Sequence, residues 1–599
     1  SSEDECTVSY SGGTTSNLRR HMNRKHSTVA SNPSSVAPPV PPPAFPESEP
    51  STSSEADTRS IRIINSAQTS IADYVSIKKP MSVHKSREID NQLLLMIVKE
   101  YHPFSLVEDP EFKKLIALLC PSYTLPSRKT ISKSLLPKMY NLIKEKVTIV
   151  LKEAEAFSLT TDGWTSRTNQ SYYALTCHFI NNQTQLTSVL LGCISFDERH
   201  TAENISVFLK SIVNEWSLSK KISAVISDNA ANVVCGIRQC GWPHFGCFAH
   251  TINLIVQSGL EKIKPILIKV KAMVEYFKRS SHALAKLTAR QNQLNLPPLK
   301  LIQDVITRWN STYNMLSRIW LLRDAIVSTL AVEQPSLNCL TQSEWNIIEH
   351  SILILKIFLD ITNDVSSEKN ISFSKVIIYI QAMHAHLNSY CAHGSDFPLE
   401  VFEMAHFLNE EVKRRFSRVH KDKTINEIIF LDPRFKQYGG MSESQFQVTK
   451  NEIESRASYL SSITCNVEEE LPQSTNNPSP LSIAESSSSF WNTYDKTVST
   501  VMAPTVSNFR AAALLEVKKY IEEPIMNRKE DPLKWWEERR RVYPRLYKIM
   551  KTRLCILPTS VPCERLFSKT GMTISDKRSR LNPEKVSQMM FINTNMNFV

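Results

Sequence analysis

The spacing of apolar residues along the chain changes several times, and each change predicts a different kind of element. Between residues 86 and 152 the apolar positions recur at helical intervals, as in Asn-Gln-Leu-Leu-Leu-Met-Ile-Val at 91–98 and again over 136–151, with many lysines between them. This pattern predicts a small basic helical domain.

The pattern then becomes typical of strands. Residues 157–164, 171–180 and 186–195 are short, rich in β-branched and aromatic residues, and separated by turn residues. A helix at about 203–216 and a buried strand at 222–228 follow. The order β-β-β-α-β predicts a mixed sheet covered by helices, which forms the first part of a core over 153–255.

The rest of the chain has a mostly helical pattern, so the fold class predicted is α+β and multidomain. Helical spacing dominates from 251 to 460, and we assign 256–504 to a helical insertion that contains a polar segment, 466–489, expected to be disordered. A last helical block, 505–599, is rich in Trp, Tyr and Arg. Residues 31–85 are predicted to be a disordered linker, because Pro, Ser and Ala dominate much of the segment, as in Pro-Pro-Val-Pro-Pro-Pro at 38–43.

Bulk properties restrict the function classes. A chain of 599 residues exceeds what one core usually supports. Its net charge of +12 favours a polyanionic partner such as nucleic acid, although an indifferent basic surface is the alternative. Twelve scattered cysteines favour a reducing compartment, and the chain has neither a long apolar run nor a signal-like N-terminal stretch. We therefore expect no membrane association and a place in the cytosol or nucleus.

Two aspartates are candidates for chemistry. Asp162 is expected at the end of the first strand and Asp228 at the end of the fourth, where side chains leave the core at the carboxyl edge of a sheet. Several carboxylates that converge on Mg²⁺ or Mn²⁺ are stabilised by the metal charge, and two such ions can promote phosphodiester cleavage. The alternative is that each aspartate caps a turn or helix.

Five stretches resemble, in this order, the signature blocks of hAT-superfamily transposases. They are Leu-Thr-Thr-Asp-Gly-Trp-Thr-Ser at 159–166, Ile-Ser-Asp-Asn-Ala-Ala-Asn at 226–232, Cys-Phe-Ala-His-Thr-Ile-Asn-Leu at 247–254, Arg-Trp-Asn-Ser-Thr at 308–312 and Pro-Cys-Glu-Arg-Leu-Phe-Ser at 562–568. The resemblance extends from about residue 90 to the C-terminus. It implies a DNA-binding role for the helical domain at 86–152.

The resemblance also implies a ribonuclease H-like core interrupted by a large helical insertion, with an Asp, Asp, Glu catalytic trio at Asp162, Asp228 and Glu564. Glu564 would lie on a helix beside the sheet. Water oriented by two divalent ions would cut one DNA strand, and the freed hydroxyl would attack the opposing strand and later the target. Taken alone, Glu564 is also compatible with an exposed helix position paired to a nearby cation.

The remaining blocks suggest DNA contacts. Cys240, His244, Cys247 and His250 have spacing that is compatible with zinc, but a strand leading into a buried helix is the alternative. The family resemblance favours a role for His250 beside the active site in handling DNA. By the same resemblance, Trp309 would stack on an extruded base and Arg308 would contact phosphate, whereas a buried Trp beside a surface Arg is the alternative.

Residues 1–30 resemble the second half of a BED-type zinc finger. His21 and His26 have suitable spacing for Zn²⁺, but only Cys6 precedes them, so the remnant lacks one of the four ligands of a closed site. We expect a truncated or decayed finger. Four basic residues of its helix would face double-stranded DNA: Arg19, Arg20, Arg24 and Lys25.

The last block, 505–599, resembles the hAT C-terminal dimerisation region and would also complete the core. Trp535, Trp536 and Tyr543 are of the residue types found in interface cores, although a purely intramolecular core is the alternative. We therefore expect a nuclear homodimer or higher homo-oligomer.

Two hypotheses for the function of the protein remain. One is a metal-dependent DNA transposase, and the other is a domesticated, catalytically silent BED-type transcription regulator.

Overall fold

The computed structural model describes residues 81–469 and 509–598, apart from 167–168, 334–336, 368–369, 394–395 and 574–581, together with residues 494 and 497. The chain divides into two units, Ser1–Ile77 and Lys78–Val599. The predicted finger, nearly all of the predicted linker and most of 466–489 lie outside the described residues. All that follows concerns the second unit.

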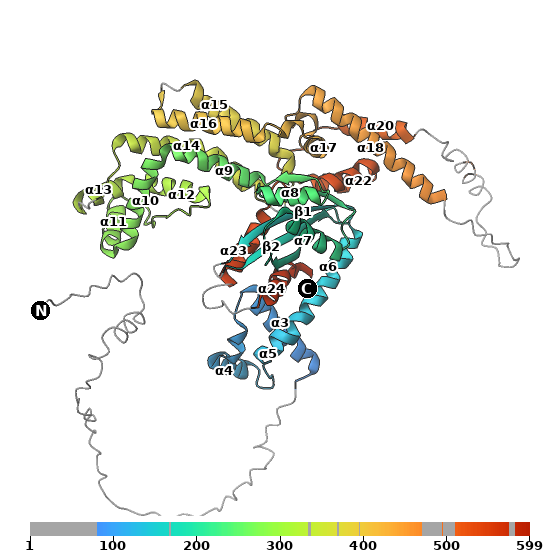
Figure 1. Cartoon of the computed structure of the whole chain (residues 1–599), viewed down its shortest axis with the longest axis horizontal. Helices are drawn as coiled ribbons and strands as arrows, with labels where there is room; N and C mark the ends of the chain where they lie inside the picture. The colour runs from blue at the N-terminus through green and yellow to red at the C-terminus, as the bar shows by residue number, and fades with distance from the viewer. Residues whose placement is uncertain are drawn as a thin grey trace, which may run out of the picture. The chain divides into compact units, whose positions relative to one another are not determined.

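A five-stranded mixed sheet lies at the centre of this unit (Figure 1). Its strand order is β3-β2-β1-β4-β5, with β1 parallel to β4 and β4 parallel to β5, whereas β1, β2 and β3 form an antiparallel meander. The strands are β1 (Phe157–Thr165), β2 (Ser171–Ile180), β3 (Leu186–Ser195), β4 (Ile222–Ser227) and β5 (His244–Gly246). The predicted β-β-β-α-β order is confirmed, with α7 (Ala202–Glu215) as its helix.

The side chains of β1 are buried alternately on the two faces of the sheet. Phe157 and Leu159 are buried in a core shared with α7 and the N-terminal helices, while Ser158 and Thr160 are buried on the other face. Successive side chains of a strand point to opposite faces, so Asp162 lies on the same face as Ser158 and Thr160. This is the face against which the helix that carries Glu564 packs.

The predicted basic helical segment does not form a separate core. It comprises α3 (Val83–Lys99), α4 (Pro110–Leu119), α5 (Arg128–Thr130) and α6 (Leu136–Glu153). Leu94 and Ile97 of α3 and Ile143 and Val147 of α6 belong to the same apolar cluster as one face of the sheet. This segment is therefore part of the framework that supports the sheet.

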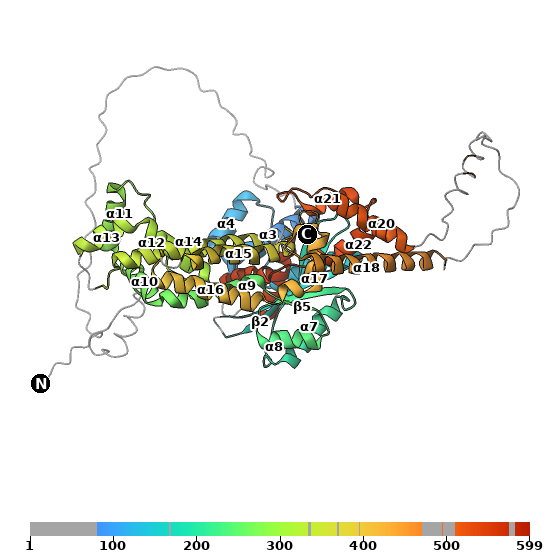
Figure 2. The same ribbon diagram turned by 90° about the horizontal axis from the view of Figure 1, so that it is seen from above.

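A long helical region follows β5, in agreement with the sequence pattern, and is seen from above in Figure 2. It shares one continuous apolar core, which also includes Ala224 and Ile226 of β4. After α8 (Ala231–Gln239), which precedes β5, its helices are α9 (Phe248–Leu260), α10 (Lys264–Arg279), α11 (Ser281–Gln293), α12 (Trp309–Leu321), α13 (Arg323–Glu333), α14 (Gln342–Val365), α15 (Val376–Ala392), α16 (Leu399–Phe416), α17 (Lys423–Leu431) and α18 (Glu443–Glu469).

The C-terminal helices return to both parts of the structure. They are α20 (Phe509–Glu522), α21 (Pro532–Arg539), α22 (Pro544–Arg553), α23 (Val561–Thr573) and α24 (Pro583–Thr594). Helices α20 and α22 pack on α18, whereas α23 packs on β1 and β2, and α24 packs on β3. None of the described helices combines the length and apolar character that crossing a membrane requires.

Asn595, directly after α24, closes the exposed edge of β3. Its Oδ1 accepts the N–H of Leu190 and its Nδ2 donates to the carbonyl of Leu190, each at 3.0 Å. An unpaired strand edge otherwise offers N–H and C=O groups to any other chain. One side chain thus supplies the hydrogen bonds that a neighbouring strand would have made.

Replacing Asn595 with Ala should therefore loosen β3. The change leaves two buried backbone groups unsatisfied, which costs about 1–3 kcal/mol locally. We expect faster amide hydrogen exchange across Leu186–Ser195, measured by mass spectrometry, and a lower thermal midpoint. Thr594→Ala, at the neighbouring exposed position, is the control, and equal exchange in both variants would contradict this role.

Candidate functional site

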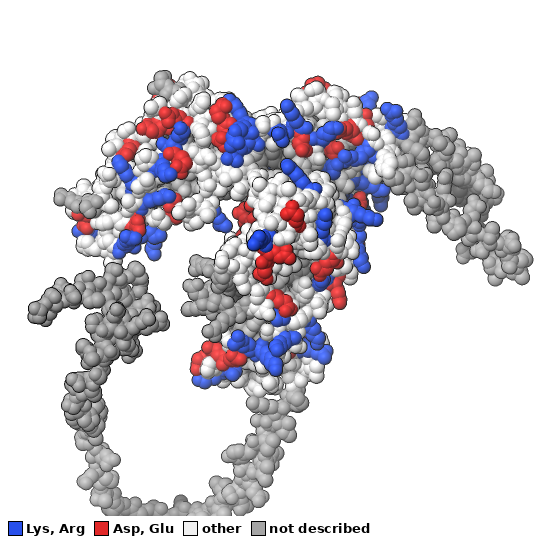
Figure 3. All heavy atoms as spheres, in the orientation of Figure 1, with Lys and Arg blue, Asp and Glu red and all other residues white. Residues whose placement is uncertain are grey.

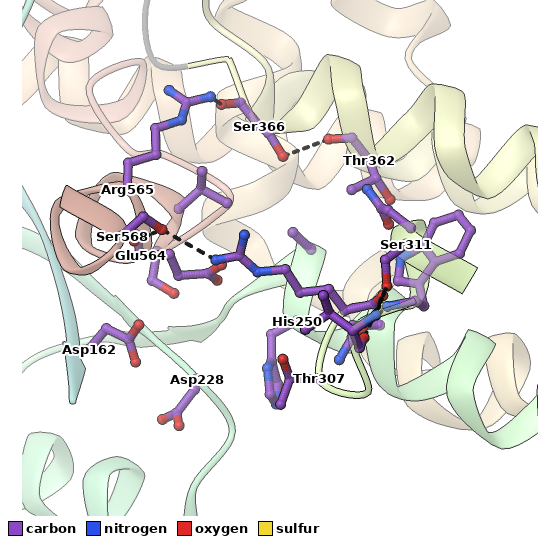
Figure 4. Close-up of a pocket in the computed structure, with 18 of the residues that line it drawn as sticks. Asp162, Asp228, His250, Thr307, Ser311, Thr362, Ser366, Glu564, Arg565 and Ser568 are labelled. Atoms are coloured by element: carbon purple, nitrogen blue, oxygen red, sulfur yellow. Dashed lines mark hydrogen bonds between the residues drawn. The ribbon is translucent and has the colours of Figure 1, made fainter. Parts of the chain in front are cut away.

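Asp162, Asp228 and Glu564 line one pocket of about 720 Å³. Figure 4 shows the three carboxylates directed into the same space, from β1, from the residue after β4, and from α23. The parallel pairing of β1 with β4 explains why the two aspartates lie side by side. Each aspartate lies two residues beyond the paired residues Thr160 and Ile226. One detail of the prediction was wrong, since Asp162 lies within β1 rather than at its end.

Glu564 is brought to this pocket by the residues on either side of it in α23. Cys563 is fully buried, and its thiol donates to the carbonyl of Thr160 at 3.3 Å. Phe567 stacks on Trp164, with ring centroids 5.8 Å apart and an interplanar angle of 18°. The predicted position of Glu564 on a helix beside the sheet is confirmed.

A second anchor fixes the segment that precedes α23. Phe248 donates its N–H to the carbonyl of Pro558 at 2.9 Å, and Ser560 donates its N–H to Cys247 Sγ at 3.3 Å. Cys247 also caps α9, because its sulfur accepts the N–H of His250. Cys247 is therefore a buried structural residue that joins α9 to the approach of α23.

Burial and the neighbouring acids perturb the pKa of Asp162. Burial, followed by the charges of Glu564 and Asp228, raises the pKa of Asp162 to about 8. A hydrogen bond from the Gly163 N–H to Asp162 Oδ1 at 2.9 Å opposes this shift. Burial and the charges of Asp228 and Asp162 also raise the pKa of Tyr173 to about 12, so the negative potential extends to that hydroxyl.

Cationic groups face the carboxylates across the pocket. Arg308, at the N-terminus of α12, donates to Ser568 Oγ at 3.4 Å. Arg565 donates to the carbonyl of Ser366 at 2.8 Å (Figure 4). His250 lines the same pocket from α9. The sequence singled out Arg308 and His250 but not Arg565, although Arg565 is adjacent to Glu564 in the last block.

The side chain of Trp309 is almost fully buried. Its side chain is only 2% exposed and belongs to the core of the helical region, and its backbone N–H donates to Asn253 Oδ1. Trp309 also lines the carboxylate pocket, beside the exposed Arg308. Its burial matches the alternative of a buried Trp beside a surface Arg, and base stacking stays a prediction.

The four residues with zinc-like spacing do not converge. His244 bonds Ser227 Oγ at 2.9 Å, Cys240 contacts Ser206, and Cys247 is engaged with Ser560. Across the described part of the chain, no set of three or more His, Cys, Asp or Glu side chains is close enough to hold a metal ion. The three pocket carboxylates therefore share a cavity without forming a closed ligand cage.

The finger candidates lie outside the described residues: Cys6, His21, His26, Arg19, Arg20, Arg24 and Lys25. Trp535, Trp536 and Tyr543 are buried in the core of this one chain, where they pack around Tyr520 and the amine of Lys436. These aromatic residues are intramolecular and are not available to a partner.

The fold and pocket thus define an RNase-like protein with a split core and three converging acids. Three family models match the chain: the ZBED1 RNase-like domain over residues 160–238, the ZBED1 RNase-like helical domain over 245–352, and the hAT family C-terminal dimerisation region over 516–596. They follow the sheet, the helical region and the C-terminal helices in turn.

Similarity to individual proteins extends over most of this chain. The chain is 25% identical to zinc finger BED domain-containing protein 4 of Homo sapiens, over 97% of this chain and 48% of that protein. It is 27% identical to a Zea mays protein named "Putative AC transposase", over 83% of this chain and 64% of the other. Zinc finger BED domain-containing protein 6 of Homo sapiens is 24% identical, over 86% and 56%. The chain spans about half to two thirds of the length of these relatives.

Together these matches show that the chain is similar to AC transposases of the hAT type and to zinc finger BED domain-containing proteins.

The raised pKa of Asp162 predicts a pH-dependent stability. The native carboxyl keeps a proton up to about pH 8, whereas the unfolded chain releases it near the ordinary value of 3.8, so this group lowers stability as pH rises between those values. Asp162→Asn should therefore raise the thermal midpoint relative to the wild type at pH 8.5 more than at pH 5. Asp197→Asn, at an exposed position, is the control. A gain that is independent of pH would contradict the assignment.

Proposed function

We propose that the chain is a DNA-binding protein of the hAT type whose carboxylate pocket supports metal-dependent DNA strand cleavage and transfer. The observation that carries the proposal is the convergence of Asp162, Asp228 and Glu564 from three separate elements. Three like charges in one cavity would lower the stability of a purely structural scaffold, because each carboxylate raises the free energy of the others.

The donor set suits Mg²⁺ or Mn²⁺. All three candidate ligands are carboxylates, the oxygen donors that these hard cations prefer. The pKa of Asp162 is raised partly by Glu564 and Asp228, and a cation between these groups would remove that repulsion. When bound, the ions would supply an activated water and stabilise the leaving oxygen of the phosphodiester.

The protein's own residues would orient the DNA. Arg308 and Arg565 each carry a planar guanidinium, which suits paired hydrogen bonds to phosphate oxygens, and both lie in the pocket lining opposite the acids. Arg308 now donates to a serine hydroxyl, a neutral partner that phosphate would replace. His250 would contribute a further polar contact near the cut.

We also propose a nuclear homodimer or higher homo-oligomer, on the basis of the dimerisation-region match over 516–596. Since Trp535 and Trp536 are buried within the chain, other residues of that region would form the contact. Ile525 and Val542 are 46% and 58% exposed, respectively. These two are the side chains we expect at the interface.

A catalytically silent, DNA-binding regulator is the second candidate. The observation in its favour is that the carboxylates form no closed cage in the described structure. Relatives named as zinc finger BED domain-containing proteins and one named "Putative transcriptional regulator tpeD" are compatible with such a role.

A nicking assay separates the two candidates. Full-length protein with supercoiled plasmid and Mn²⁺ or Mg²⁺ should produce nicked circles, and Asp228→Asn should reduce the rate by roughly ten-thousandfold, the scale on which loss of one catalytic carboxylate acts. DNA binding, followed by gel shift, should be unchanged. Equal nicking by both proteins, or none by either while binding persists, would favour the regulator.

Metal binding can be measured independently of cleavage. Mn²⁺ should raise the thermal midpoint of the wild type, since a ligand at a hundred times its Kd adds about 2.7 kcal/mol to stability. The paired change Asp162→Asn with Glu564→Gln should abolish that rise, and Asp197→Asn should retain it. If the paired variant responds to Mn²⁺ as the wild type does, the ion binds elsewhere.

A further inference from the structure

A second pocket, of about 460 Å³, lies at the opposite end of the same parallel strands. Glu155 and Ala156, just before β1, and Lys220 and Lys221, just before β4, form one wall, and helices α18 and α22 form the other. The carboxylates lie toward the other ends of β1 and β4. From Phe157 to Asp162 a strand advances about 17 Å, so the two pockets are separate sites.

This second pocket is strongly basic. Five cationic side chains and one carboxylate line it: Lys220, Lys221, Arg456, Lys548, Arg553 and Glu155. The carboxylate is itself engaged, because Lys551 lies 3.3 Å from Glu155. In Figure 3, Lys and Arg side chains gather over the neighbouring parts of α6 and α22. The side chains that line the cavity therefore carry a net positive charge.

Two of the cations are held in place. Arg456 of α18 and Arg553 of α22 both donate to Oε2 of Glu427, which is 2% exposed. One buried carboxylate thus fixes two guanidiniums, and each has five N–H donors of which one is given to Glu427. Burial and the neighbouring charge of Arg553 lower the pKa of Arg456, as expected where cations are crowded together.

The other cations can adapt to a ligand. Lys221 donates to the carbonyl of Ala154 at 2.7 Å, whereas Lys220 and Lys548 are exposed and the described residues provide no ion pair for either. Thr424 and Thr552 add hydroxyl groups to the lining. Fixed guanidiniums, mobile amines and hydroxyls form a donor set suited to phosphate oxygens.

We propose that this pocket, defined here as the basic pocket, binds a ligand with several adjacent phosphate groups. A single phosphate would leave most of the cations without a partner, and a volume of 460 Å³ lies within the range of small-ligand sites. Consecutive phosphates of a DNA backbone and a soluble polyphosphate share this chemistry. The inference does not depend on cleavage at the carboxylate pocket.

The test is calorimetric titration of the full-length protein with sodium tripolyphosphate in EDTA, so that no divalent ion can link the anion to the carboxylates. We expect binding that weakens at least tenfold in the double variant Lys220→Gln, Lys548→Gln. These two side chains are exposed, so the fold should be retained, and circular dichroism checks this. Lys413→Gln with Lys450→Gln, on α16 and α18 outside the lining, is the matched control.

Competition then identifies the source of the phosphates. If a 12-base-pair duplex displaces tripolyphosphate from the wild type, the basic pocket binds a DNA backbone; if it does not, the ligand is a soluble polyphosphate. Absence of tripolyphosphate binding at millimolar concentration, or equal affinity in the double variant and the wild type, would overturn the proposal.

Discussion

Repulsion between Asp162, Asp228 and Glu564 must be offset by contacts elsewhere, and those contacts organise the centre of the structure. Cys563 donates to β1 from within α23, Phe567 stacks on Trp164, and Ser560 is tied to Cys247 at the start of α9. Each of these joins segments that are hundreds of residues apart. The acids can share a cavity because an apolar framework around them does not allow them to separate.

Local pattern was sufficient to predict β1 to β4, α7 and the long run of helices that begins with α9, because alternation and helical spacing reflect burial directly. The three-residue β5 was indicated only by the alternative of a strand leading into a buried helix. It could not position Asp162 within β1 rather than at its end, since the pairing with β2 that extends the strand to Thr165 is a tertiary contact. Trp309 illustrates the same limit: a motif identifies the residue, but only packing decides whether its ring is exposed. Arg565 and the basic pocket depend on residues brought together from distant segments.

The parallel pairing of β1 with β4 gives the sheet two chemically different ends. At one end carboxylates gather, and at the other lysines and arginines do. A parallel pair produces this polarity because all its strands enter at one edge and leave at the other. The three acids and the basic pocket thus lie at opposite edges of one sheet, although Arg308 and Arg565 also line the pocket of the acids.

The hydrogen bonds from Asn595 to Leu190 have a consequence for how the protein is made. During synthesis β3 leaves the ribosome about 400 residues before Asn595, at a rate of roughly 5–20 residues per second, so its edge stays open for tens of seconds. Contacts so remote in sequence also slow folding. A strand with an open edge can pair with another nascent chain, so β3 is open to such pairing until the C-terminal residues have been made.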